Sequence, residues 1–134
     1  MGYFEGKSLD IGRKLLEVLA SGEEVIRFYG NYEDFICLTD SRVIYTAVIE
    51  NDSGVVEEEE IVSIGYHNIV TVSIKKRVGE YVGSVNLETA VQTHNFSFET
   101  ESEIKEFFKI VSGYASKTKI WENFYILSFF IKKY

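Results

Sequence analysis

Hydrophobic residues recur at helical spacing near both ends of this 134-residue chain, and between the ends they recur at every second position. Near the start, Ile11, Leu15 and Val18 fall at positions i, i+4 and i+7, and Ser21-Gly22 follows as a stop signal. This pattern predicts a short N-terminal helix over residues 8–21.

Seven short strands are predicted from the period of two that follows, between residues 24 and 98. Turn residues such as Asn51-Asp52-Ser53-Gly54 separate them. Because the connections are short, we expect neighbouring strands to pair antiparallel. The predicted strands are residues 25–29, 35–38, 42–49, 55–64, 70–75, 80–88 and 93–98.

A second helix is predicted over residues 100–113. Thr100 and Glu103 form a T-x-x-E capping box, in which each side chain satisfies one free N–H group of the first helical turn. The apolar stripe that follows consists of Ile104, Phe107, Phe108 and Val111. We expect both phenylalanines to be buried, and Glu101 to pair with Lys105 on the outer side.

The order of elements predicts a mainly β (α+β) fold, formed by residues 1–134 as a single domain. With 46% hydrophobic residues, the chain is long enough to bury one core. An open sheet of seven strands leaves its edges and its apolar face uncovered. We therefore expect a seven-stranded bent antiparallel sheet or partly open barrel, with the C-terminal helix capping one end.

The C-terminal extension, residues 119–134, is unusually apolar: nine of the twelve residues from Ile120 to Ile131 are hydrophobic, with lysines on both sides. As a helix this stretch is about 18 Å long, too short to cross a bilayer. Its polar positions Glu122, Asn123 and Ser128 are dispersed, which predicts burial on more than one side. The candidate interaction surface consists of Trp121, Phe124, Tyr125, Leu127, Phe129, Phe130 and Ile131.

Three alternatives stay open for this extension: a subunit interface, a membrane contact and part of the core. The pattern favours self-association, giving a homo-oligomer, because a membrane-surface helix needs one polar face. A peripheral membrane module that uses the lysine-flanked aromatic segment is the alternative function.

Charge is distributed unevenly within the formal net charge of -7: residues 1–60 carry 14 acidic and 5 basic residues, and residues 61–134 carry 7 and 9. An acidic half disfavours binding to nucleic acid and to anionic lipid. The run Glu57 to Glu60 is expected to form a solvated strand edge that resists pairing with other chains.

No arrangement of residues predicts catalysis, a cofactor or a metal site. Cys37 lies in an apolar strand, His94 shares a strand face with Phe96, and His67 lies in a loop far from both. No zinc-ligand spacing or phosphate-binding glycine motif occurs. The chain is therefore expected not to be an enzyme. Its first residues lack the pattern of a signal peptide, which predicts a cytoplasmic location.

Several short stretches occur in the order and spacing of a known family. They are Leu15-Leu16 with Gly22-Glu23-Glu24-Val25, Leu38-Thr39-Asp40-Ser41-Arg42-Val43-Ile44, Ile64-Gly65-Tyr66-His67-Asn68-Ile69 and the helix of residues 101–113. These stretches resemble the motifs of the short bacterial pleckstrin-homology-like domains. Two departures are Gly65, where that family usually has proline, and the basic run Lys75-Lys76-Arg77.

This resemblance implies seven strands with a C-terminal capping helix, and a non-enzymatic module that binds proteins or oligomerises. In the hairpin segment, Thr39 and Asp40 are expected to form the turn by bonding nearby N–H groups. Eukaryotic relatives hold phosphoinositides with basic residues of the first hairpin. Here Glu33 and Asp34 occupy that loop, so we expect no inositol phosphate to bind there.

Overall fold

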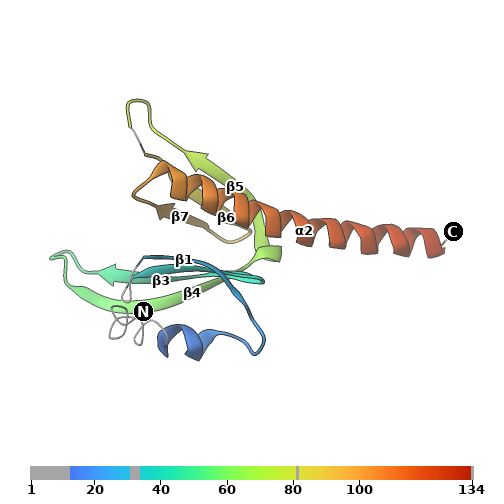
Figure 1. Cartoon of the computed structure of the whole chain (residues 1–134), viewed down its shortest axis with the longest axis horizontal. Helices are drawn as coiled ribbons and strands as arrows, with labels where there is room; N and C mark the ends of the chain where they lie inside the picture. Colours follow the sequence, from blue (N-terminus) through green and yellow to red (C-terminus); the bar gives the residue numbers. More distant parts are fainter. Residues whose placement is uncertain (1–12, 31–33, 81, 134) are drawn as a thin grey trace. The chain divides into compact units, whose positions relative to one another are not determined.

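The computed structural model describes residues 13–30, 34–80 and 82–133, with side chains as far as residue 117 (Figure 1). It consists of two compact units, Met1–Ile64 and Gly65–Tyr134. The two units are described separately below.

The first unit contains a helix and a four-stranded antiparallel sheet with the order β1-β2-β3-β4. Residues 13–18 are helical, whereas the start predicted for this helix lies outside the described residues. In the pairing of β1 with β2, Gly30 lies opposite Phe35 at one end and Val25 lies opposite Thr39 at the other. In the pairing of β2 with β3, Ile36 lies opposite Tyr45 and Leu38 lies opposite Val43. The strands are β1 (Val25–Gly30), β2 (Phe35–Thr39), β3 (Arg42–Glu50) and β4 (Val56–Gly65).

The core of the first unit lies between the helix and this sheet. Leu15 from the helix packs with Phe35, Cys37 and Ile44, and Phe28 stacks on Phe35 with ring centroids 5.4 Å apart. Burying each large apolar side chain stabilises the fold by about 1.5–3 kcal/mol. The helical spacing of the N-terminal apolar residues therefore places Leu15 and Val18 on the side of the helix that packs against the sheet.

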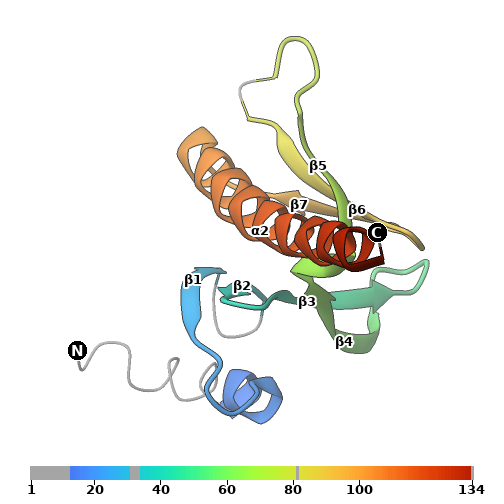
Figure 2. The ribbon, with the colours of Figure 1, turned by 90° about the vertical axis from the view of Figure 1, so that its right-hand side faces the viewer.

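The second unit consists of a three-stranded antiparallel sheet, with the order β5-β6-β7, and a long helix that packs against it. Figure 2 shows this helix, α2, running across the strands. Its buried residues Ile104, Phe107 and Val111 meet a sheet whose own buried residues include Val85 and Leu87. The elements are η2 (Tyr66–Asn68), β5 (Ile69–Lys75), β6 (Ser84–Thr89), β7 (Thr93–Ser97) and α2 (Glu101–Lys133).

The seven predicted strands are confirmed, with two differences in detail. They form two hydrogen-bonded sheets instead of one, so the sheet is not closed into a full barrel. A short 3-10 turn, η2, directly precedes β5 in the second unit. β6 begins at Ser84 instead of residue 80, because a turn closed by the Glu80 N–H and the Arg77 carbonyl, with Gly79 at a φ of 92°, occupies that stretch.

The C-terminal helix has half of the predicted capping box and is much longer than the expected 100–113. The Glu103 carboxylate accepts a hydrogen bond from the Thr100 hydroxyl (3.1 Å) instead of from a backbone N–H. The Glu103 N–H donates to the Thr100 hydroxyl (3.2 Å), and Glu101 lies 3.8 Å from Lys105. The helix then continues to Lys133. Gly113 does not end it because its φ is not positive, and a helical glycine costs only about 1 kcal/mol relative to alanine.

The stripe that α2 buries also differs by one residue from the prediction. Phe107 is fully buried, but Phe108 is only half-buried. Ala115 takes part instead, so the buried positions follow one straight line along the helix. That line consists of Ile104, Phe107, Val111 and Ala115.

Candidate interaction site

All seven residues of the predicted interaction surface lie on the C-terminal half of α2. The helix has 33 residues and is therefore about 50 Å long. The longest strand that it covers, β5, has seven residues and spans about 23 Å. Figure 1 shows the first half of α2 over the strands of its own unit and the second half extending past them. The interaction surface therefore lies on the part of α2 that this sheet is too short to cover.

The first half of α2 is occupied by contacts within its own unit. The Phe107 ring lies 5.1 Å from the rings of Phe96 and Phe98. Tyr114 stacks on Tyr66 of η2, with centroids 4.8 Å apart and planes 11° apart. These contacts fix the direction in which the helix leaves the sheet, because they hold two successive stretches of its length.

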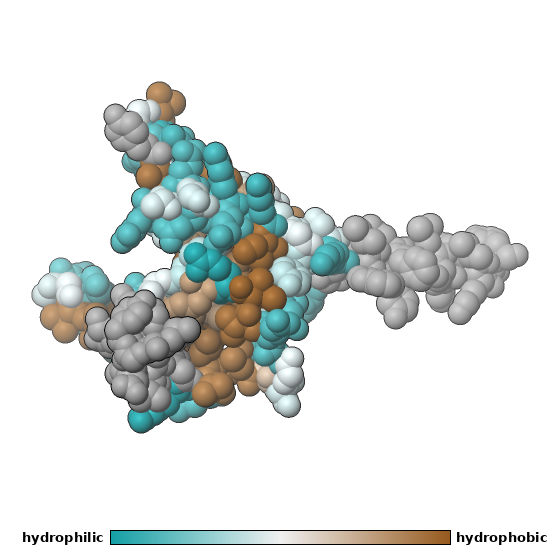
Figure 3. Space-filling model, viewed as in Figure 1, coloured by the Kyte–Doolittle hydropathy of each residue, from teal (hydrophilic) through white to brown (hydrophobic). Residues whose placement is uncertain are grey.

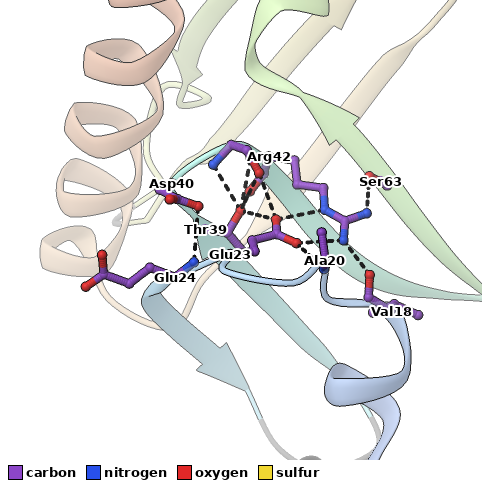
Figure 4. A network of polar contacts seen from close by, with 9 residues as sticks. Val18, Ala20, Glu23, Glu24, Thr39, Asp40, Arg42 and Ser63 are labelled. Atoms are coloured by element: carbon purple, nitrogen blue, oxygen red, sulfur yellow. Dashed lines mark hydrogen bonds and ion pairs between the residues drawn. The ribbon is translucent and has the colours of Figure 1, made fainter.

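A buried ion pair between Glu23 and Arg42 organises the first unit at the start of β3 (Figure 4). Arg42 Nη2 and Nε lie 2.8 and 2.9 Å from the two carboxylate oxygens of Glu23. The guanidinium also donates to Ser63 Oγ of β4 (3.2 Å) and to the Val18 carbonyl at the end of the N-terminal helix. One side chain thus joins the helix, the turn before β1 and the outer strand β4.

The Glu23 carboxylate is almost fully saturated by this network. It accepts from the Thr39 hydroxyl (2.6 Å), the Ser41 hydroxyl (2.8 Å) and the Ala20 N–H (2.9 Å). The Arg42 hydrogen bonds, and after them those of Thr39, Ala20 and Ser41, hold the pKa of Glu23 well below its usual range, against the opposing effect of burial. Glu23 is therefore ionised in the folded chain at neutral pH.

The turn that Thr39 and Asp40 were predicted to form is confirmed. Thr39 Oγ1 accepts from the N–H groups of Ser41 (3.1 Å) and Arg42 (3.0 Å), and Asp40 Oδ1 accepts from the Glu24 N–H (3.2 Å). The central role of Glu23 was not predicted, although two of the matching stretches each contain one member of the Glu23–Arg42 pair. The signal available was an acidic residue in one motif and a basic residue in the other. These motifs therefore encode a structural network instead of an exposed ligand site.

Cys37 lies in the core cluster of the first unit and is fully buried. Burial raises the pKa of its thiol to about 11, and the charge of Glu23 adds to the rise. The side chain is a neutral thiol at neutral pH, which is the form least suited to nucleophilic attack.

The two histidines occupy different environments in the second unit. His94 on β7 is buried, which lowers its pKa, and its Nε2 lies 3.1 Å from the Gln92 side-chain nitrogen. His67 is exposed on η2. Over the residues that the structure describes, no group of three or more His, Cys, Asp or Glu side chains is arranged to hold a metal ion.

Opposite charges are concentrated on two separate hairpins. β4 is the last strand of the first sheet, and its residues Glu57 to Glu60 are all exposed, as expected for a solvated edge. In the second unit, Lys75 and Arg77 line an open pocket of about 320 Å³ at the β5–β6 hairpin. Glu80 and the hydroxyl groups of Ser84 and Ser97 also line this pocket.

The first hairpin and the length of α2 bear on lipid binding. Glu33 lies outside the described residues, and Asp34 accepts a hydrogen bond from the Thr46 hydroxyl (3.0 Å). Within the described ranges, no helix combines the length and the apolar character needed to cross a membrane.

Comparisons with known proteins agree with this architecture. A pleckstrin-homology domain protein from Shewanella loihica superposes with a TM-score of 0.62 at 14% identity, covering 79% of this chain and 91% of that one. The pleckstrin homology domain from Shewanella amazonensis gives 0.56 at 19% identity, covering 83% and 92%. The Vps36 N-terminal PH domain gives 0.51 at 14% identity, covering 75% and 84%. No curated protein matches the sequence significantly.

These likenesses show a PH-like fold: antiparallel sheets followed by a C-terminal helix. The family model described as Bacterial PH domain matches residues 18–113, which include both sheets, the Glu23–Arg42 network and the first part of α2. Domains of the PH family are generally binding modules without catalytic activity. The chain belongs to the bacterial PH domain family.

Proposed function

We propose that this chain is a non-enzymatic protein-binding and assembly module that self-associates through the C-terminal half of α2. The observation that carries the proposal is the length of α2. The family match ends at residue 113, yet the helix continues without a break to Lys133. The part of α2 beyond the family match, residues 114–133, is about 30 Å long, and its end extends past the sheet that the first half covers (Figure 1).

The sequence of this part of α2 favours a protein partner. Nine of the twelve residues from Ile120 to Ile131 are apolar, and a helix of this composition does not remain uncovered in water. Its polar positions, Glu122, Asn123 and Ser128, lie about 100–140° apart around the helix axis at 3.6 residues per turn. A second copy supplies the same apolar helix, and two such helices cover each other.

Contact with a membrane surface is the alternative. Lysines at positions 117, 119, 132 and 133 flank the apolar stretch and favour an anionic surface. However, a helix lying in a membrane interface needs one continuous polar face, and the polar positions here are dispersed. The net charge of -9 over residues 1–60 also opposes an anionic surface.

Light scattering on the full chain after size-exclusion chromatography tests self-association. We expect a mass above that of the monomer, and we expect Leu127→Asp to lower it, because the substitution places a charge at an apolar position. Asn123→Asp is the matched control, since it adds the same charge four residues away at a position that is already polar. Circular dichroism verifies that both variants keep their helix content.

Vesicle sedimentation separates the two functions. Vesicles of phosphatidylcholine and phosphatidylglycerol are mixed with the parent chain at low and at physiological salt. A monomer that binds these vesicles, and loses binding on Leu127→Asp, overturns the proposal and supports the membrane alternative. An oligomer that leaves the vesicles unbound supports self-association.

A further inference from the structure

The β3–β4 hairpin is a strongly acidic projection of the first unit. The chain has no lysine or arginine between Arg42 and Lys75, and within that interval it carries Glu50, Asp52 and Glu57 to Glu60. Glu57 to Glu60 are all exposed, and none of them forms an ion pair with any described residue. We call the segment from Ala47 to Glu60 the acidic arm.

The acidic arm extends beyond the rest of its sheet (Figure 1). The pairing of β3 with β2 ends at Tyr45, and the last contact there joins the Phe35 N–H to Thr46 Oγ1 (2.9 Å). Among the described residues, β4 is the only neighbour of β3 from Ala47 onward. A two-stranded ribbon is only marginally stable by itself in water.

Both faces of the acidic arm expose apolar residues. Val48 and Ile49 are 52% and 44% exposed, and as neighbours in a strand they point to opposite faces. Val55 and Val56 repeat this arrangement on the other side of the turn. Figure 3 shows hydrophobic surface at the free end of the hairpin, on the left of the view. The arm therefore offers a partner both charge and apolar surface.

The β5–β6 hairpin of the second unit has the complementary character. Its pocket of about 320 Å³ is lined by Lys75 and Arg77, with Glu80 as the single carboxylate, and Lys76 is exposed next to it. Over the described part of the chain, neither Lys75 nor Arg77 forms an ion pair. The same hairpin exposes Ile74 (44%) and Val78 (fully).

We propose that the acidic arm of one copy binds the basic pocket of the β5–β6 hairpin of a second copy. The two surfaces match in charge sign and in their exposed β-branched residues, and opposite charge steers such encounters. Because the two surfaces differ, the contact is head-to-tail, and its repetition builds a ring or a chain of subunits. The contact goes beyond the proposed α2 interface and is independent of it, because it uses surfaces other than α2.

Zero-length carbodiimide cross-linking tests the contact, because this reagent joins lysine amines to carboxylates that touch. Equal amounts of unlabelled and ¹⁵N-labelled chain are mixed, cross-linked and digested for mass spectrometry. We expect mixed-isotope peptides joining Lys75 or Lys76 to Glu57–Glu60, reduced about fivefold or more when salt rises from about 20 to 500 mM. Lys14 lines a pocket with Glu59 and Glu60 in the same copy, so a same-isotope cross-link there is the internal control.

Charge reversal provides the second test. Glu57→Lys, Glu58→Lys, Glu59→Lys and Glu60→Lys together change the charge of the acidic arm from -6 to +2, because Glu50 and Asp52 remain. Lys75→Glu with Lys76→Glu and Arg77→Glu reverses the charge of the pocket. Each variant alone loses the salt-sensitive association in sedimentation velocity. An equal mixture regains it, because the basic arm of one variant meets the acidic pocket of the other. Circular dichroism verifies folding, and the parent-chain cross-links decide the question if a variant unfolds.

The outcomes separate this contact from the α2 interface. Same-isotope peptides alone, or no peptide between the arm and the pocket, overturn the contact. If Leu127→Asp still lowers the mass in that case, the α2 proposal stands. If mixed-isotope peptides persist in a Leu127→Asp chain, and that substitution leaves the mass of the assembly unchanged, the head-to-tail contact stands and the α2 interface fails.

Discussion

In the first unit, a buried ion pair between Glu23 and Arg42 ties the N-terminal helix and β4 to the turn before β3, whereas in the second unit an aromatic cluster around Phe107 ties α2 to β7. The polar network is directional, since each member has a fixed partner. The aromatic cluster is held by area and shape. The stability of the polar network is therefore sensitive to charge and pH, and that of the aromatic cluster to the volume of its side chains.

A large-to-small substitution in the aromatic cluster is expected to give the largest loss in the free energy of unfolding. Phe107→Ala should lower the free energy of unfolding by about 3–5 kcal/mol, because it empties a fully buried site against Phe96 and Phe98. Urea denaturation followed by circular dichroism measures the loss. Phe108→Ala is the matched control: the same side chain is removed from a half-buried position, so a clearly smaller loss is expected. Equal losses at both positions would contradict the stripe described here.

Breaking the Glu23–Arg42 ion pair is expected to give the second-largest loss in stability. Glu23→Gln should lower the free energy of unfolding by about 2–4 kcal/mol, because it leaves the Arg42 guanidinium, only 23% exposed, without its charge partner. Glu24→Gln removes an equal charge from the next residue, whose side chain is exposed, and should change stability by less than about 0.5 kcal/mol. A loss at Glu24 as large as that at Glu23 would mean that net charge, not the network, is responsible.

How much of these two regions the sequence predicted depends on how local the signals are. The Thr100–Glu103 cap and the Thr39 turn follow from residues three or fewer apart, and both were predicted. The Glu23–Arg42 pair joins residues 19 apart, and no periodicity indicates which carboxylate reaches which cation. Its partners become evident only when β1 and β2 are paired and the turn brings Arg42 back to Glu23.

The candidate interaction site shows a similar limit. Composition alone marked residues 120–131 as needing cover, because so many apolar residues are unfavourable in water. Their continuity with α2 was not predicted, since apolar residues on all sides give no helical period. The run Glu57 to Glu60 in the acidic arm was interpreted as a solvated strand edge. The projection of the arm beyond β2 depends on the strand register, which the sequence does not specify.

The pH dependence of stability should differ between the two units, because Glu23 lies in the first and His94 in the second. The effect should be smaller than that of Phe107→Ala or Glu23→Gln. The folded pKa of Glu23 is lowered from an ordinary 4.5, so the unfolded chain binds the proton more readily. Its contribution is complete above that value and is lost as pH falls through the folded pKa. His94 also has a lowered pKa, from 6.5, so its neutral-state contribution begins to fall nearer neutrality.

Measuring the free energy of unfolding between about pH 7.5 and pH 3 resolves the two contributions, because this range spans the ordinary pKa values of both groups, 4.5 and 6.5. Glu23→Gln should flatten the decline below about pH 5 and leave the upper part unchanged. His94→Gln should flatten the part that starts near pH 6.5 and leave the acid part unchanged. If Glu23→Gln has the same acid slope as the parent, the network does not depend on the Glu23 charge.

The smallest effect is expected at the exposed cap of α2, which uses the same turn chemistry as Thr39 in a solvated setting. Thr100→Ala removes the hydroxyl that accepts the Glu103 N–H at 3.2 Å, and it should cost about 1 kcal/mol. Thr100→Ser keeps the hydroxyl and should cost less than half of that. Thr39→Ser likewise keeps the acceptor, but Thr39→Ala removes a fully buried hydroxyl that two partly buried N–H groups use as their acceptor, and it should cost about 2 kcal/mol. Equal costs for the two alanine variants would show that burial adds nothing to this turn, and the contrast between the polar network and the exposed helix end would then fail.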